Sequence, residues 1–269
     1  MNSHLNTGAG TGADHPPAVK NRLMKKIHES ETTHKICAFM CGLCLLFILL
    51  TTSVQAVCFW IPNWWRNEYA KYDTPSHVNG EMSLDDAVHV TEDMLNYCIG
   101  KIDTLDDTEA TIDGVTAPFF TDREKSHLAD CRELFMAGMR ARVIAVFILI
   151  VFTIYIYMHN GREKTLRLMA RGYLYSFAAV IMLAVCIAIL AMIDFTFVFT
   201  EFHHIFFDND LWILYPDRDN LINIMQEQVF ADAAVWIGCI FASVSIIFAL
   251  IAAAILRSGS RDGKHPEHA

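Results

Sequence analysis

The two longest polar segments of this 269-residue chain contain few basic residues. Residues 61–140 hold 16 acidic and 7 basic residues, and residues 200–232 hold 7 acidic residues against a single basic one, Arg218. These segments account for the formal net charge of −9. A polar surface this poor in Lys and Arg excludes nucleic acid as a partner, because binding to a phosphate backbone depends on basic patches.

The chain also lacks a recognisable motif for a nucleophilic serine or cysteine, such as Gly-x-Ser-x-Gly. Six of its eight cysteines fall in apolar runs, where a thiol behaves as a small apolar side chain. Only Cys98 and Cys131 lie outside those runs. They could form a disulfide in an oxidising compartment, but their spacing alone leaves the pairing open. We expect no metal and no cofactor.

Apolar sequence is abundant and makes up 54% of the residues. Four runs account for it: Ile36 to Trp60, Val143 to Met158, Tyr173 to Phe199 and Ala233 to Leu256. Roughly 20 apolar residues cross a bilayer core as a helix. The second run is shorter, but Arg140 and Arg142 can reach the headgroups with their long side chains and extend it outward. We therefore predict an all-α membrane protein with four transmembrane helices.

The basic residues predict the orientation of these helices, because cytoplasmic loops retain Lys and Arg. Twelve of them lie before the first run, between the second and third runs, and after the fourth. Both termini are therefore expected in the cytoplasm, with residues 61–141 and 200–232 forming a helical extracytoplasmic cap. The expected organisation is a disordered basic leader at residues 1–35, a membrane domain at residues 36–256 and a cytoplasmic tail at residues 257–269.

Local patterns predict elements within the two outer segments. Apolar residues at intervals of three and four predict an amphipathic helix from Leu84 to Ile99. The acidic, turn-rich stretch from Asp103 to Gly114 leaves two readings open, a loop or a short hairpin. Thr121 followed by Glu124 predicts a helix start with a capping box. The stretch from Tyr215 to Asp219 predicts a turn before an Asp-capped helix that continues to Phe230.

Two histidines stand where the outer segments meet the apolar runs. His203 lies among large aromatic residues directly after the third run, and an imidazole there can titrate near neutral pH. His127 follows the predicted capping box, and helical spacing places it on one face with Cys131. A lone histidine is by default a structural residue, and this reading stays open for His127. Together the two could form an acid and base pair.

Carboxylates near the outer ends of the runs are further candidates. Asp194 near the end of the third run is costly unless it is paired or hydrated, which makes it a candidate site residue. An ion pair with Arg140 or Arg142 is the structural alternative. A metal-binding reading would use His203, His204, Asp208 and Asp210. Adjacent histidines without a partner four residues along a helix argue against it.

The segments around the two histidines resemble a family of four-span integral membrane proteins from Gram-positive bacteria that includes the lipoprotein intramolecular transacylases. The matching stretches are residues 120–135 and 202–212, continued by Pro216, Asp217, Asp219, Leu221 and Ile222. The likeness covers residues from about 35 to 256. The departures are the long charged leader, the acidic insert around Asp103 to Asp113, and Cys131 where a small aliphatic residue is expected.

The resemblance implies a membrane acyltransferase that acts within one substrate. It would move the acyl chain at the glycerol sn-2 position of a diacylglyceryl-modified N-terminal cysteine onto the α-amine of that cysteine, giving a lyso-form lipoprotein. The implied partners are diacylglyceryl-modified lipoproteins and membrane lipids, at the extracytoplasmic side of the plasma membrane. The oligomeric state stays open.

The resemblance also implies a division of roles. The attacking amine must lose a proton to a base, and the oxyanion needs a hydrogen-bond donor. We expect His203 to be the base and His127 the donor, with the exchange of these roles left open and His204 structural. Supporting or substrate-binding roles are expected for Arg132, Asp194, Asp208, Asp210 and Trp212.

A non-enzymatic membrane protein is the main alternative, for instance a transporter subunit or a sensor whose histidines detect external pH. Short loops and the lack of inverted repeats or broken spans count against transport. If the protein is a sensor, loss of the histidines should leave the lipoproteins of the cell unchanged. If it is a transacylase, the same loss should change them.

Overall fold

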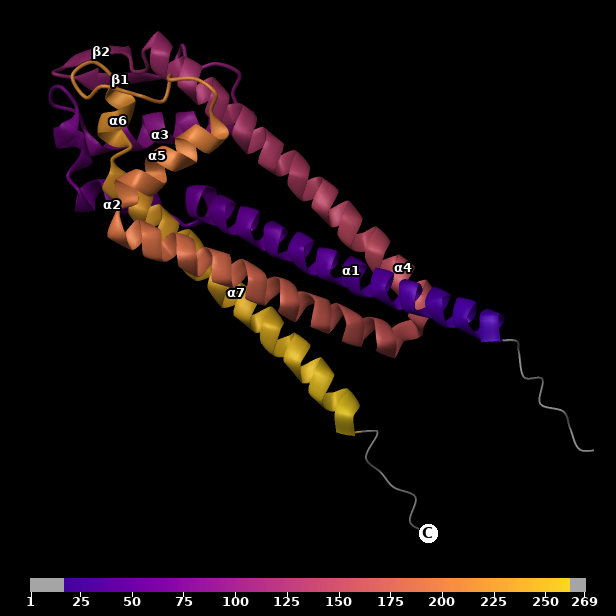
Figure 1. Cartoon of the computed structure of the whole chain (residues 1–269). Helices are drawn as coiled ribbons and strands as arrows, with labels where there is room; N and C mark the ends of the chain where they lie inside the picture. The colour runs from indigo at the N-terminus through magenta and orange to yellow at the C-terminus, as the bar shows by residue number, and fades with distance from the viewer. Residues whose placement is uncertain (1–16, 262–269) are drawn as a thin grey trace, which may run out of the picture.

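The computed structural model describes the backbone of residues 17–261 and the side chains of residues 29–258. Long helices run side by side, and the short elements gather at one end of them (Figure 1). The elements in chain order are α1 (Pro17–Gln55), the π-helical turn η1 (Ala56–Trp60), α2 (Trp64–Lys71), the 3-10 turn η2 (Thr74–His77), α3 (Leu84–Cys98), β1 (Glu109–Ile112), β2 (Val115–Pro118), α4 (Asp122–Ile193), α5 (Phe195–Phe206), α6 (Asn220–Ile224) and α7 (Glu227–Arg261).

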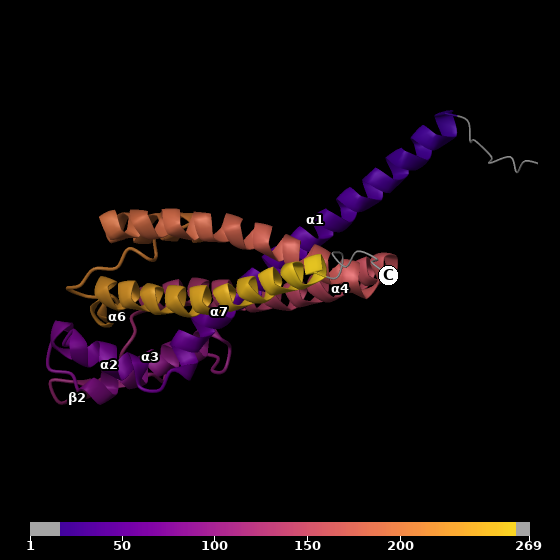
Figure 2. The ribbon, with the colours of Figure 1, turned by 90° about the horizontal axis from the view of Figure 1, so that it is seen from below.

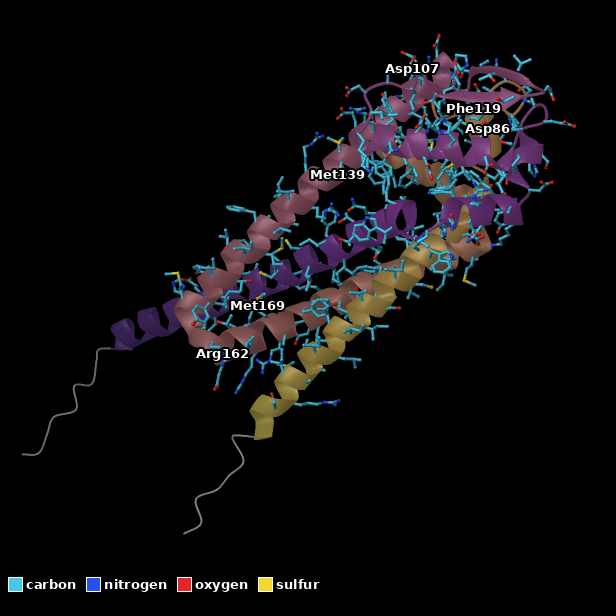
Figure 3. The ribbon with its side chains drawn as sticks, turned by 180° about the vertical axis from the view of Figure 1, so that it is seen from behind. Asp86, Asp107, Phe119, Met139, Arg162 and Met169 are labelled. Carbon is cyan, nitrogen blue, oxygen red and sulfur yellow. The ribbon has the colours of Figure 1, made fainter. Side chains whose placement is uncertain are left out.

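Helix α4 consists of two arms that meet at Gly161. Gly161 has a φ of 69° and a ψ of 177°, a conformation that glycine adopts far more readily than other residues. Residues 122–160 run away from the short elements and residues 162–193 run back towards them (Figure 1). Arg162 therefore lies at the opposite end of the molecule from Asp107 (Figure 3).

Three helices of the described residues are long and apolar enough to cross a membrane: Glu29–Trp60, Asp122–Ile193 and Glu227–Ser258. The predicted second and third runs lie in the two arms of α4. The helix that contains the third run ends at Ile193, before the end of the predicted run, because Asp194 has an extended backbone conformation. The Asp194 side chain accepts a hydrogen bond from the Phe197 N–H at 2.9 Å and so caps the start of α5. The prediction of a mainly helical membrane protein is confirmed.

The expected disordered leader differs from the structure, which is helical from Pro17 onward. Residues 18–35 contain no glycine or proline and include many good helix formers, so nothing in them ends a helix. Proline is also well tolerated at the first position of a helix. Residues 1–16 and 262–269 lie outside the described residues, and residues 257–261 of the predicted tail belong to α7.

Helix α1 lies very close to the second arm of α4 at a set of small residues. A Cβ added to Gly172 would lie 2.4 Å from the backbone carbonyl of Ala38, and one added to Gly42 would lie 2.5 Å from Ser176 Oγ. Ser176 Oγ donates a hydrogen bond to the carbonyl oxygen of Phe39 at 2.8 Å. Small residues and hydroxyl bonds of this kind hold helices together where lipid removes the hydrophobic driving force between them.

The short elements form one folded unit, here called the head, which comprises residues 61–128 and 195–226. Figure 2 shows α2, α3, β2 and α6 together at one end of the long helices. The buried Tyr69 hydroxyl shares a hydrogen bond with Thr91 Oγ1 at 2.6 Å and so joins α2 to α3. The head core draws on both segments and includes Tyr69, Val90, Leu105, Phe119, Phe120, Leu221 and Ile224.

The predicted helix from Leu84 to Ile99 is confirmed as α3. The stretch that left a loop or a hairpin open forms a hairpin, so the head is not entirely helical and the all-α prediction needs this correction. Strands β1 and β2 pair antiparallel, with Ile112 opposite Val115. Asp113 and Gly114 between them both have positive φ, which is the conformation of a tight two-residue hairpin turn.

Replacing Gly172 by Ala should lower the thermal stability of the purified protein, because the new methyl group would overlap the α1 backbone. Overpacking of this kind costs about 1–3 kcal/mol. Gly238→Ala in α7 is the matched control, since an added Cβ there meets nothing within 4 Å. Melting temperatures in detergent compare the two variants. If Gly172→Ala melts no lower than Gly238→Ala, the close packing of α1 on α4 is contradicted.

Candidate active site

Two buried histidines from separate elements meet inside the head. His127 lies in the second turn of α4 and His203 in the last turn of α5. Each is 7% exposed, and their ring centroids are 6.0 Å apart. These are the two residues predicted to be catalytic, and the fold places them side by side although 76 positions separate them in the chain (203 minus 127).

The start of α4 fixes the position of His127. Thr121 Oγ1 accepts a hydrogen bond from the Glu124 N–H at 3.3 Å, and Glu124 Oε2 accepts one from the Thr121 N–H at 2.6 Å. The predicted capping box is therefore confirmed. Glu124 is completely buried, and its other oxygen accepts a hydrogen bond from the Leu221 N–H at the start of α6. One carboxylate thus joins two helix starts, one turn before His127. Burial raises the pKa of Glu124.

Aromatic rings enclose His203. Phe199 lies one turn earlier in α5 at a centroid distance of 4.3 Å, and Trp212 stacks on the imidazole at 4.8 Å. Phe207 lies 5.6 Å from His203 and also meets His127 edge to face at 5.2 Å. Phe207 therefore contacts both imidazoles, and the enclosure separates them from bulk water.

His203 has one nitrogen committed to the protein and one uncommitted. Its Nδ1 lies 2.7 Å from the carbonyl oxygen of Phe199. A carbonyl can only accept, so Nδ1 is the donor and the lone pair of the neutral ring is on Nε2. Burial lowers the pKa of His203, although the Phe199 carbonyl acts in the opposite direction. His203 is therefore neutral at pH 7 and suited to accept a proton at Nε2.

His127 is more strongly affected by its surroundings. Burial lowers its pKa to about 4, with His203 contributing in the same direction and Asp130 opposing it. The pKa of each imidazole therefore lies below the ordinary value of 6.5, and that of His127 lies furthest from the neutral range expected of a histidine at such a position. His127 Nδ1 is buried and has no hydrogen-bond partner among the described residues, which is uncommon in folded proteins.

The loop that follows α5, residues 207–214, is here called the covering loop. It covers the two imidazoles and is tied by hydrogen bonds to the first turns of α4. The guanidinium of Arg123 donates hydrogen bonds to the carbonyl oxygens of Asp210 and Ile213. The side-chain amide of Asn209 donates to Asp130 at 2.9 Å. The loop brings Phe207 and Trp212 over the histidines, so its attachment to α4 controls their enclosure.

The turn after this loop is built differently from the prediction. The predicted Asp-capped helix is interrupted, because α6 ends at Ile224 and α7 begins at Glu227. Asp219 does not cap α6 with its side chain. Its buried carboxylate instead accepts hydrogen bonds from the Tyr215 N–H at 2.8 Å and from Thr121 Oγ1 at 3.4 Å.

Trp212 is the predicted supporting residue that contacts a histidine, by its stacking on His203. Arg132 instead joins α4 to the loop after α3, where it donates to the Ile102 carbonyl oxygen at 2.8 Å and lies 4.7 Å from the Tyr97 ring. Asp208 and Asp210 are exposed in the covering loop. Their supporting or substrate-binding role stays a prediction.

Asp194 caps the first turn of α5, two turns before His203. It does not form the ion pair that was the alternative for it. Arg140 lies 3.6 Å from Glu133, and Arg142 donates to the Gln55 side chain at 2.8 Å. His204, predicted to be structural, is exposed and lies 3.6 Å from Glu201.

The two cysteines outside the apolar runs are free thiols. Burial raises the pKa of Cys98 to about 12 and raises that of Cys131 as well, so both are protonated at neutral pH. The thiol of Cys131 lies 3.6 Å from His127 Nε2. Among residues 29–258, no three His, Cys, Asp or Glu side chains are grouped so that they could hold a metal ion.

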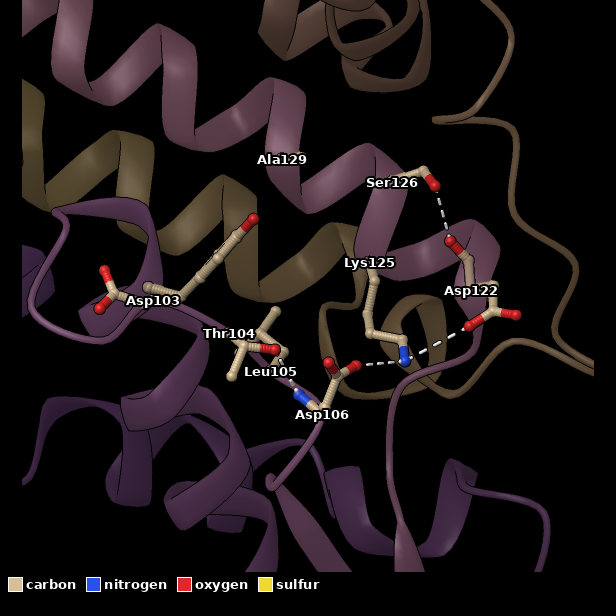
Figure 4. Close-up of a pocket in the computed structure, with 9 residues that line it drawn as sticks. Asp103, Thr104, Leu105, Asp106, Asp122, Lys125, Ser126 and Ala129 are labelled. Carbon is tan, nitrogen blue, oxygen red and sulfur yellow. Dashed lines mark hydrogen bonds and ion pairs between the residues drawn. The ribbon is translucent and has the colours of Figure 1, made fainter.

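A surface hollow of about 370 Å³ lies on a different face of α4 (Figure 4). Lys125 there lies 2.8 Å from Asp106 and 3.3 Å from Asp122. Neither His127 nor His203 lines this hollow. Its ion-paired lining offers little apolar surface to an acyl chain, so the histidine pair is the better candidate for the site.

The family model of the lipoprotein intramolecular transacylase Lit matches residues 39–230. The chain belongs to this family. The matched range includes both histidines and the covering loop. A search of curated proteins finds no match to the chain.

The fold is similar to that of a solved Lit structure, the membrane integral lipoprotein intramolecular transacylase Lit from Bacillus cereus. The TM-score is 0.66 at 18% sequence identity, over 86% of this chain and 99% of that chain. A structure of the same Lit with a histidine replaced by arginine has a TM-score of 0.66 at 15% identity, over 89% of this chain and 99% of that chain. At these identities the likeness shows the Lit fold.

Several residues of the site were not predicted. Phe199 and Phe207 lie four residues before and after His203, and this helical spacing could have identified them as its neighbours. Asp130 and Asn209 are joined across 79 positions (209 minus 130), and no local pattern indicates that pair. Glu124 was predicted only as part of a capping box, because its bond to Leu221 depends on the fold.

Replacing His127 by Phe should make thermal stability less dependent on pH. The pKa of His127 falls from 6.5 to about 4 in the folded protein, so between these values the unfolded chain binds the extra proton. The stability that the neutral buried ring contributes is present above pH 6.5 and is lost as the pH falls towards 4. Phenylalanine keeps the ring packing but binds no proton.

Melting temperatures at pH 7.5 and pH 5 test this for the wild type, His127→Phe and the exposed control His204→Phe. The wild type and the control should lose more stability on acidification than His127→Phe. Equal losses in all three would mean that folding does not lower the pKa of His127.

Proposed function

We propose that this chain is an intramolecular O-to-N acyltransferase. It moves the sn-2 acyl chain of a diacylglyceryl-cysteine lipoprotein onto the α-amine of the same cysteine, and the product is a lyso-form lipoprotein. The observation that carries the proposal is the pair of buried, neutral imidazoles in an aromatic enclosure. Membership of the Lit family supports the substrate class.

His203 serves as the base in this reaction. The α-amine has a pKa of about 7.7–8.0 and attacks the ester carbonyl in its neutral form. The attack forms the C–N bond, and the nitrogen then gives its surplus proton to His203 Nε2. The ester C–O bond breaks, and the same proton passes from His203 to the departing glycerol oxygen. The imidazole begins and ends neutral, which fits the lowered pKa of His203.

His127 serves as the donor to the oxyanion. The tetrahedral intermediate carries a negative charge on the former carbonyl oxygen, and a preorganised N–H stabilises it most where water is excluded. The lowered pKa keeps His127 neutral, and a neutral imidazole has one N–H. The unpaired nitrogen Nδ1 is the atom available for this bond.

No enzyme nucleophile is needed, because the amine and the ester belong to one substrate molecule. Reactions between groups held together in this way have very high effective molarities. The half-buried thiol of Cys131 lies beside His127, and its raised pKa keeps it protonated and unreactive. The enzyme contributes a base, a donor and a dry enclosure.

The substrate reaches the pair when the covering loop moves. The exposed face of α5 carries large apolar side chains that suit contact with lipid, namely Phe197, Phe202, Ile205 and Phe206. Acyl chains can lie against this face while the cysteine end enters below Phe207 and Trp212. The bonds of Arg123 to the loop and of the loop residue Asn209 to Asp130 then return the rings to the histidines.

The same proposal includes four transmembrane helices, with both termini in the cytoplasm and the head outside it. The reversal at Gly161 supports it, because each arm of α4 is then a separate span. Arg162 lies at this reversal, at the end of the molecule opposite the head (Figure 3), and the basic residues Lys164, Arg167 and Arg171 follow it in the sequence.

Cysteine labelling tests the topology with two exposed positions at opposite ends of the molecule. A membrane-impermeant maleimide should label Asp107→Cys in intact cells, because this residue lies in the head. It should label Arg162→Cys only after the cells are permeabilised. Wild-type protein controls for the native cysteines. Labelling of Arg162→Cys but not Asp107→Cys in intact cells would reverse the topology and place the histidine pair in the cytoplasm.

Replacing His127 or His203 by Phe should reduce acyl transfer by roughly 10² to 10⁴ fold, the range for loss of a general acid or base. Phenylalanine keeps the ring packing of the enclosure, so the loss reports the missing nitrogens. The double variant should be little worse than the weaker single variant, because residues that act on one transition state are strongly non-additive. Purified variants are assayed on a diacylated lipopeptide.

His204→Phe is the matched control and should retain nearly full activity, since His204 is exposed beside the pair. Wild-type rates in both buried-histidine variants would remove the site from consideration. Small, additive losses would identify two structural histidines instead.

A further inference from the structure

Cys131 occupies a position from which it can control His127. It lies one turn further along α4, and its sulfur is 3.6 Å from His127 Nε2. A methyl or isopropyl group could fill this space but could not form a hydrogen bond.

We propose that Cys131 is a positioning residue that fixes the tautomer of His127. Its thiol donates a hydrogen bond to Nε2, so the single ring proton of the neutral imidazole resides on Nδ1. This inference rests on the proposed function and adds to it the reason why His127 is the donor.

The chemistry of the two groups favours this direction of the hydrogen bond. An imidazole nitrogen with a lone pair is a good acceptor, whereas sulfur is a weak one. Burial raises the pKa of Cys131, so the S–H proton is present at neutral pH. Nδ1 has no partner among the described residues in either tautomer, so the contact at Nε2 is the one that distinguishes the two arrangements.

The two imidazoles are then complementary. In His203, the Phe199 carbonyl accepts the Nδ1 proton, and the lone pair on Nε2 is uncommitted. In His127, the Cys131 thiol occupies the lone pair on Nε2, and the proton on Nδ1 is uncommitted. The first ring can only accept from a substrate and the second can only donate to it. The exchange of roles that the sequence left open is thereby removed.

The charged and titratable groups that act on His127 come from two elements. Arg123, Asp130 and Cys131 lie on its own helix, and His203 faces it from α5. Arg123 and Asp130 are both engaged by the covering loop. Cys131 is therefore the neighbour whose hydrogen bond acts directly on a ring nitrogen of His127.

Nitrogen NMR of the full-length protein, labelled with ¹⁵N-histidine, reads the tautomer directly. The wild type should show His127 with its proton on Nδ1, assigned by comparison with His127→Phe. Cys131→Ala should give a mixture of tautomers, and Cys131→Ser should restore the Nδ1–H form because a hydroxyl also donates. Cys98→Ala is the matched control, a buried thiol in α3 without a hydrogen bond to either imidazole.

Activity on a diacylated lipopeptide supplies the second measurement. In Cys131→Ala, kcat should fall about fivefold to tenfold, which corresponds to one hydrogen bond of ordinary strength. KM should change little, and Cys131→Ser should regain most of the rate. A merely structural thiol would lower stability without this split and without rescue by serine.

The results separate the two proposals. A wild-type His127 with its proton on Nε2 would overturn the role of Cys131, as would a Cys131→Ala variant with unchanged tautomer and kcat. The proposed function would survive either result if the wild type forms lyso-lipopeptide. A wild type with the Nδ1–H tautomer and no transfer activity would instead contradict the proposed function. If Cys131→Ala fails to fold, the wild-type spectrum and the serine variant still decide.

Discussion

The arrangement of the head depends on the hydrogen bonds of one buried carboxylate, Glu124. Removal of a carboxylate from water is costly unless its oxygens are paired. Here one oxygen accepts from the Thr121 N–H and the other from the Leu221 N–H. These bonds join the start of α4 to the start of α6 and fix the height at which His127 enters the core. Without these bonds, the position of the histidine pair relative to the covering loop would not be fixed.

The polarity of the enclosure determines what the two imidazoles can do. Burial among Phe199, Phe207 and Trp212 keeps both rings neutral, so neither stores a charge before the substrate arrives. An O-to-N acyl shift within one molecule needs only a proton acceptor and a hydrogen-bond donor. In the proposed mechanism, the bond to the Phe199 carbonyl makes His203 the proton acceptor, and the bond from the Cys131 thiol makes His127 the donor.

Local signals predicted what local interactions determine. The capping box of Thr121 and Glu124 and the amphipathic helix α3 followed from spacing alone. The histidine pair was also found, because residue type and position at the edges of apolar runs single it out. The bonds of Glu124 to Leu221 and of Asn209 to Asp130 were not predictable, since they join residues far apart in the chain. The partners of Arg132 were not predictable for the same reason, since they lie in α3 and in the loop after it.

Tandem mass spectrometry of one lipopeptide tests the central claim most directly. A synthetic diacylglyceryl-cysteine peptide with two different acyl chains is incubated with the purified protein. Transfer within one molecule leaves the intact mass unchanged, while the N-terminal fragment gains the chain that was at the sn-2 position. An intact mass increased by one acyl chain would show an external donor. An N-terminal fragment that stays unacylated would contradict the account.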